Sequence, residues 1–133
     1  PVLNPLNIQQ ISAGPDHAAA LTVEGALYTW GYGSNGRLGH GADTDLAVPT
    51  RVELLERKHI VRVSCGGHHT AVITDRGELY SFGWNFYGQL GIPDAPDDCM
   101  EPSLVNFPMP AGGRFIEISC GEQHTVAYVA VPK

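Results

Sequence analysis

The chain has 133 residues, 43% of them hydrophobic, which predicts one globular domain with a packed core. Its formal net charge is −6 and its eight Lys and Arg residues are scattered, so no nucleic acid and no anionic membrane is expected as a partner. No stretch approaches the roughly 18 consecutive apolar residues that span a bilayer. Three cysteines, an odd number, favour free thiols and a cytoplasmic or nuclear location.

The sequence repeats itself. Residues 11–39 align without a gap on residues 63–91, an offset of 52, and 12 of the 29 pairs are identical. A third copy begins at Ile118, offset by 55 from the second. A fixed period of this length is typical of repeat architectures. The pattern divides residues 1–133 into a half-unit at 8–24, a first full repeat at 25–76 and a second full repeat at 77–131.

Within the units, short apolar runs between glycine-rich turns predict strands. In chain order the clearest strands are residues 49–52, 60–63, 69–74, 78–82 and 102–105. Glu24-Gly25 and Asp75-Arg76-Gly77 predict tight hairpins with glycine in the left-handed conformation. Residues 52–59 are too few for a helix that is stable alone. The insertion at residues 92–101, with two prolines, predicts a solvated loop.

About four short strands in about 50 residues are typical of one blade of a β-propeller. A blade of this size cannot bury both of its faces alone and must stack on neighbours. The sequence therefore predicts an all-β fold, a partial β-propeller of four-stranded antiparallel blades.

Two sequence blocks alternate along the chain. The first, around Trp-Gly, occupies residues 30–39 and 82–91, and the second, around Cys-Gly and His-Thr, occupies residues 64–70 and 119–125. Over residues 8–130 the chain resembles the regulator of chromosome condensation family; Gly33, Arg37 and Ala13 depart from its pattern. The resemblance implies a slice of a seven-bladed ring. The remaining blades, or another copy, are then expected to pack against this chain.

The repeat predicts structural roles for its recurring glycines and histidines: Gly14, His17, Gly31, Gly36, Gly39, Gly66, His69, Gly83, Gly88, Gly91, Gly121 and His124. Gly33 is replaced by Asn85 in the second copy. Both residues tolerate positive φ, which favours a turn over a dinucleotide-binding glycine motif. Each recurring histidine follows Ala13, Cys65 or Cys120, which favours a local structural hydrogen bond over a zinc site. No metal or cofactor is expected.

Aromatic residues occur in two kinds of position. Those at strand spacing and in register between the repeats are expected in the blade core: Tyr28, Trp30, Tyr80, Phe82 and Trp84. The variable turn positions are the candidate contacts for a partner protein: Tyr32, Arg37, Phe86 and Tyr87. In the acidic insertion, Asp94, Asp97 and Asp98 are candidate contacts for a basic partner, with a merely solvated loop as the alternative.

These features predict a protein–protein interaction scaffold. No G-x-S-x-G elbow is present, and no catalytic residue is expected in the chain. The resemblance implies two alternatives: part of a guanine-nucleotide exchange factor for a small GTPase, as in the founding family member, or the propeller domain of a larger enzyme such as a ubiquitin ligase.

Overall fold

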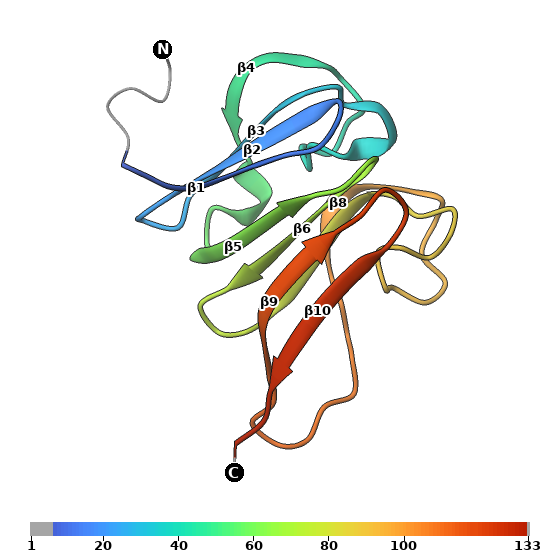
Figure 1. Cartoon of the computed structure of the whole chain (residues 1–133). Helices are drawn as coiled ribbons and strands as arrows, with labels where there is room; N and C mark the ends of the chain where they lie inside the picture. Colours follow the sequence, from blue (N-terminus) through green and yellow to red (C-terminus); the bar gives the residue numbers. More distant parts are fainter. Residues whose placement is uncertain (1–6, 133) are drawn as a thin grey trace.

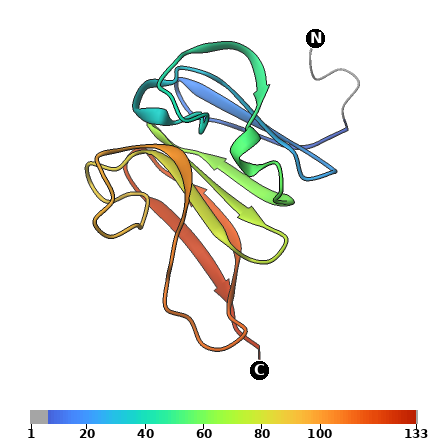
Figure 2. The same cartoon turned by 180° about the vertical axis from the view of Figure 1, so that it is seen from behind.

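The computed structural model describes residues 7–132, which form three antiparallel sheets arranged one after another (Figures 1 and 2). The first blade contains β1 (Ile8–Ala13), β2 (His17–Thr22), β3 (Leu27–Gly31) and β4 (Leu46–Arg51). The second contains β5 (Ile60–Cys65), β6 (His69–Thr74), β7 (Leu79–Trp84) and β8 (Asp98–Leu104). The third is the hairpin of β9 (Arg114–Cys120) and β10 (Thr125–Ala130). Single 3₁₀ turns lie at Ser34–Gly36 and Glu53–Leu55.

Each four-stranded blade is a meander in which consecutive strands pair. The β2–β3 and β6–β7 turns contain Gly25 and Gly77, with φ of +85° and +78°. This confirms the predicted left-handed glycines. Strands β1, β5 and β9 of successive sheets contact one another, and β4 and β8 form the far edges (Figure 1). In the described residues no helix has the length and apolar character needed to cross a membrane.

The sheets and the sequence repeats divide the chain at different points. A repeat counted from Gly25 supplies β3 and β4 of one blade and then β5 and β6 of the next. The half-unit at residues 8–24 supplies β1 and β2, which complete the first blade. Each sequence unit therefore joins two neighbouring blades covalently.

The core lies between the blades. Leu21 and Leu27 of the first blade pack with Val63, Val72 and Phe82 of the second, and all five are almost inaccessible to solvent. A second cluster fills the next interface, formed by Ala71, Ile73, Leu79, Val105, Phe115 and Ile118. Of the aromatic residues expected in the core, Phe82 is fully buried. Tyr28, Trp30, Tyr80 and Trp84 are half-buried, and Tyr80 packs against the first of these clusters.

The acidic insertion is shorter than its sequence predicts. Residues 98–101 were expected in a loop, but they belong to β8, where Cys99 pairs with Gly83 and Asp98 with Trp84. Backbone pairing with β7 overrides the acidic composition, since β8 is an edge strand whose exposed side chains can be polar. The loop itself covers residues 85–97.

Candidate functional site

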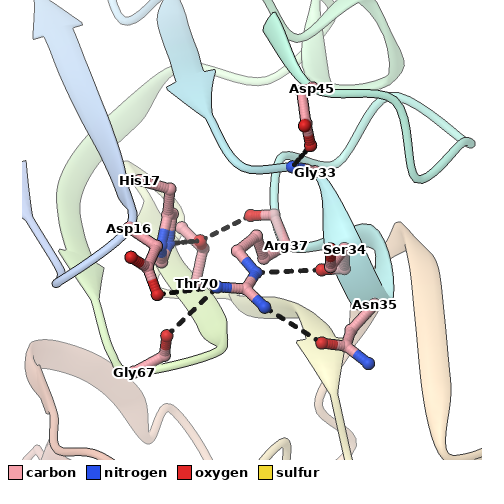
Figure 3. A network of polar contacts seen from close by, with 9 residues as sticks. All are labelled: Asp16, His17, Gly33, Ser34, Asn35, Arg37, Asp45, Gly67 and Thr70. Carbon is pink, nitrogen blue, oxygen red and sulfur yellow. Dashed lines mark hydrogen bonds and ion pairs between the residues drawn. The ribbon is translucent and has the colours of Figure 1, made fainter.

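A hydrogen-bonded connection holds the first blade to the second (Figure 3). The His17 ring, at the start of β2, has its Nε2 2.8 Å from Thr70 Oγ1 on β6. The Thr70 hydroxyl donates to the carbonyl of Arg37, back in the first blade, at 2.7 Å. The same arrangement recurs one blade later, with His69 Nε2 2.8 Å from Thr125 Oγ1 and Thr125 donating to the Gln89 carbonyl. The prediction of a local histidine hydrogen bond was wrong, because these bonds join neighbouring blades.

The geometry fixes the protonation of His17. The Thr70 hydroxyl has one proton, which it gives to the Arg37 carbonyl, so it accepts a proton from His17 Nε2. His17 Nδ1 is then an unprotonated, buried nitrogen, and it has no hydrogen-bond partner. Burial lowers the pKa of His17 to about 4, and the nearby Arg37 charge acts in the same direction. Burial likewise lowers the pKa of His69 to about 4. Both rings are neutral interior groups at pH 7.

Arg37 is a buried structural residue, so its prediction as a partner contact was wrong. Its side chain is only 4% exposed. The guanidinium donates to the Ser34 carbonyl at 2.9 Å, to Asn35 Oδ1 at 3.0 Å and to the Gly67 carbonyl of the second blade at 3.4 Å. It also lies 3.9 Å from a carboxylate oxygen of Asp16 (Figure 3). A buried arginine in which each of the three guanidinium nitrogens already donates a hydrogen bond within the fold is not available to another protein.

The structure gives two separate reasons for glycine at the recurring positions. Positive φ holds at Gly31, Gly36, Gly39, Gly83, Gly88 and Gly91. Gly14, Gly66 and Gly121 instead lie against the ring of the histidine three residues later, and a Cβ on Gly66 would lie 2.5 Å from His69 Cε1. The predicted turn at Gly33 and Asn85 is confirmed, because their carbonyls accept hydrogen bonds from the Gly36 and Gly88 N–H groups at 3.0 Å each, although neither residue has positive φ. Gly33 has φ of −98° and is small because a Cβ there would collide with the Thr44 carbonyl.

All three cysteines are free thiols, and two of them contact the preceding blade. The Cys65 backbone N–H donates to Ser12 Oγ, and the Cys120 N–H donates to Ser64 Oγ, each at 2.9 Å. Burial raises the pKa of Cys65 to about 12 and raises the pKa of Cys120 and of Cys99. In residues 7–132 no three His, Cys, Asp or Glu side chains are grouped so as to hold a metal ion.

One rim of the blades carries an exposed aromatic cluster. Phe86 and Tyr87, predicted as contacts, are each 60% exposed. The Trp84 ring stacks on Phe86 with centroids 5.9 Å apart, and Tyr87 meets both rings edge-on at 5.4 and 5.1 Å. His68 also meets Trp84 in an edge geometry, with ring centroids 5.1 Å apart. Tyr32, also predicted, is 55% exposed at the position in the first blade that Trp84 occupies in the second.

The sequence interpretation missed Trp84 and His68 as members of this cluster. Trp84 shares the strand spacing of the core aromatics, but β7 ends there, so its ring lies at the rim. His68 replaces the Asp16 of the first copy, and that difference between repeats was the available signal. Asp94, Asp97 and Asp98 are exposed, and Asp98 pairs across the strands with Trp84. Asp98 also accepts a hydrogen bond from the Asn35 amide at 2.9 Å.

The stacked four-stranded sheets define consecutive blades of a β-propeller. The regulator of chromosome condensation (RCC1) repeat matches residues 24–73 and 76–128, and the chain belongs to this family. A second description of the same repeat matches residues 8–37 and 60–89.

Relatives with different named activities share these repeats. The chain is 35% identical over 125 residues to the ultraviolet-B receptor UVR8 of Arabidopsis thaliana, covering 94% of this chain and 28% of that protein. It is 42% identical over 125 residues to the serine/threonine-protein kinase Nek9 of Xenopus laevis, covering 90% of this chain and 13% of that protein. It is 39% identical over 127 residues to the probable E3 ubiquitin-protein ligase HERC3 of Homo sapiens, covering 96% and 12%. The chain thus spans less than a third of the length of each of these relatives.

Solved structures match the fold over nearly the whole chain. Human WBSCR16 superposes with a TM-score of 0.78 at 31% identity, over 96% of this chain and 32% of that structure. Prp20p of Saccharomyces cerevisiae superposes with a TM-score of 0.83 at 23% identity, over 93% and 31%. The sheets described here therefore correspond to part of an RCC1-type propeller.

Proposed function

We propose that this chain is part of a protein-binding scaffold and that its aromatic rim is the contact surface. The observation that carries the proposal is the aromatic cluster of the half-buried Trp84 with the exposed Phe86 and Tyr87, at the end of β7 and in the loop that follows. Aromatic residues are enriched in protein interfaces, and Trp and Tyr are enriched at their energetic centres. Phe86 and Tyr87 are each 60% exposed, so most of both side chains is open to a partner.

The rest of the chain supports a binding role by being rigid. The histidine–threonine connections and the buried Arg37 fix one blade on the next, so the rim loops stand on a preorganised base. The same histidines are neutral and engaged in these connections, which leaves them no role as surface acid–base groups. The related receptor, kinase and ubiquitin ligase carry different named activities, which favours binding as the shared role of the repeats.

Further blades are part of the same proposal. The outer faces of the first and third sheets expose Ile11, Val126 and Tyr128, whose equivalents in the second blade are buried. Apolar faces of this kind invite association. We expect the isolated 133-residue piece to self-associate in light scattering. A monomer of 14.3 kDa with cooperative unfolding would contradict the proposal that further blades or copies cover these faces.

Site-specific crosslinking tests the contact surface in the full-length protein. A photocrosslinking amino acid at Tyr87 is expected to trap a partner protein in cells. The same amino acid at Arg76, which is exposed in the β6–β7 turn on the opposite rim, is the matched control. Equal trapping at the two positions, or none at Tyr87, would contradict the proposal. Release of bound nucleotide from a panel of small GTPases, added in parallel, would instead identify an exchange factor.

A further inference from the structure

Acidic residues gather on the rim that carries the aromatic cluster. We define the acidic rim as the loops 14–16, 32–45, 66–68, 85–97 and 121–124, together with Asp98 at the start of β8. Within residues 7–132 its exposed carboxylates are Asp16, Asp43, Asp45, Asp94, Asp97, Asp98 and Glu122. Among the described residues, the acidic rim contains a single Lys or Arg residue. This is Arg37, which is buried beside Asp16. The acidic rim therefore presents negative charge with no exposed cation to balance it.

The opposite rim carries charges of both signs. It consists of the β2–β3 and β6–β7 turns and of the links between blades, residues 52–59 and 105–113. Arg57, Lys58, Arg76 and Arg114 lie there or directly beside it, among carboxylates such as Glu53, Glu56, Asp75 and Glu78. Lys58 pairs with Glu78 at 3.2 Å. Charge on that rim is mixed, so the negative field belongs to the acidic rim and is not a general property of an acidic chain.

The aromatic rings and the carboxylates occupy the same small area. Asp98 pairs with Trp84 across β7 and β8, and the Asp97 carbonyl accepts the Asn85 N–H at 2.6 Å. The Trp84 ring contacts both Phe86 and His68, while Phe86 and Tyr87 are each 60% exposed and keep open ring surface. Open aromatic surface next to carboxylates is the combination that holds a cation: the ring attracts the charge and the carboxylate accepts its hydrogen bonds.

We propose that the acidic rim binds an arginine-containing segment of a partner protein at Trp84, Phe86, Tyr87, Asp97 and Asp98. Arginine fits better than lysine, because its planar guanidinium can lie on a ring and donate a pair of hydrogen bonds to a carboxylate at the same time. Nucleic acid and anionic membranes are repelled by the same carboxylates. This inference rests on the proposed binding function and names the chemistry of the partner.

Fluorescence anisotropy with the full-length protein tests the inference directly. The probe is a fluorescein-labelled peptide of alternating Arg and Ser, compared with versions in which Lys or the neutral citrulline replaces every Arg. We expect the Arg peptide to bind, the Lys peptide to bind about fivefold more weakly and the citrulline peptide not to bind. Affinity for the Arg peptide should fall as NaCl is raised, since exposed charges are screened.

Variants locate the binding surface. The double variants Phe86→Ala/Tyr87→Ala and Asp97→Asn/Asp98→Asn should each weaken binding of the Arg peptide about tenfold or more. Asp75→Asn removes an exposed carboxylate from the opposite rim and should change nothing. Melting temperatures show whether each variant is folded. If the double aspartate variant does not fold, the single variant Asp97→Asn is measured in its place. Equal binding by the rim variants and the wild type, or equal binding of the Arg and citrulline peptides, would overturn the inference.

The two proposals fail separately. If crosslinking at Tyr87 traps a partner while the Arg peptide does not bind, the contact surface stands and its proposed cationic partner is wrong. If position 87 traps nothing and the Arg peptide does not bind, both proposals are wrong.

Discussion

Ile11 in the first blade and Val63 in the second occupy the same position of the repeat, yet their exposed fractions are 67% and 2%. Val63 lies in the cluster that joins the first blade to the second. The corresponding side of the first blade is open, and it contains a hollow of about 650 Å³ lined by Ala13, Ala18 and Trp30 among others. Burial of this position is therefore a property of the joint between two blades and not of the blade itself.

The third blade shows the same contrast on the other face. Ala71 and Ile73 in β6 are 0% and 1% exposed because the third blade covers them. Their equivalents in β10, Val126 and Tyr128, are 49% and 65% exposed. Since the strands are equivalent, the difference shows that neighbouring blades supply most of the apolar burial, as expected for a repeat protein.

The largest expected effect separates two glycines that the repeat makes equivalent. Gly36 and Gly88 have φ of +78° and +74°, so a valine is strained at both. A Cβ at Gly36 would also collide with the Met100 backbone of the next blade, whereas at Gly88 nothing lies within 4 Å. We expect Gly36→Val to lower the free energy of unfolding by roughly 4 kcal/mol and Gly88→Val by roughly 2 kcal/mol. Urea denaturation checks this, and equal losses would show that the blade contact adds nothing.

The next effect is a loss of stability in acid. The pKa of both His17 and His69 is about 4 in the folded chain, below the ordinary value of 6.5. As the pH falls below 6.5, the unfolded chain binds protons that the folded chain refuses, so stability present at pH 7 is lost progressively towards pH 4. At pH 5 the loss should be on the order of 2 kcal/mol per histidine.

Denaturant titrations between pH 7 and pH 5 measure the slope of the free energy of unfolding against pH. His69→Gln should flatten it, while His124→Gln, at the equivalent but exposed position of the third blade, is the control. An unchanged slope in His69→Gln would show that this ring titrates normally.

A smaller effect concerns the connection between blades. Thr70→Val keeps the shape of the side chain but leaves His17 Nε2–H and the Arg37 carbonyl without their partner. We expect a loss of about 1–3 kcal/mol in the free energy of unfolding. The control is Ala18→Thr, which introduces a hydroxyl at the equivalent position of the first blade, where no described blade faces it. It should change the free energy of unfolding by less than about 0.5 kcal/mol. An unchanged free energy of unfolding in Thr70→Val would show that this connection does not stabilise the contact between the two blades.

The smallest effect tests the exposed face itself. Ile11→Ala should cost less than about 0.5 kcal/mol in the 133-residue chain at dilutions where it does not self-associate, because 67% of the side chain is then in water. Val63→Ala should cost about 2 kcal/mol, since its neighbours cannot fully close the space. In a longer chain with a blade before residue 8, the cost of Ile11→Ala should rise towards that of Val63→Ala. If it stays near zero there, no blade covers this face.

The sequence by itself determined the all-β fold, the blade repeat and the glycine turns at Gly25 and Gly77, because period, strand pattern and turn chemistry are local properties. It also indicated Phe86 and Tyr87 as exposed contacts, since they differ from the corresponding residues of the other copy.

Only the tertiary structure decided what depends on the neighbouring blade. Arg37 looks like a surface residue in a variable turn, but the Gly67 carbonyl and Asp16 enclose it. His17 looks like a local hydrogen-bonding residue, but its partner is 53 residues away, a distance in sequence that no local pattern encodes. The same holds for the acidic rim, where loops from separate parts of the chain meet. Their charges and rings form one surface because the blades stack, and stacking is a long-range contact that the repeat implies but does not place residue by residue.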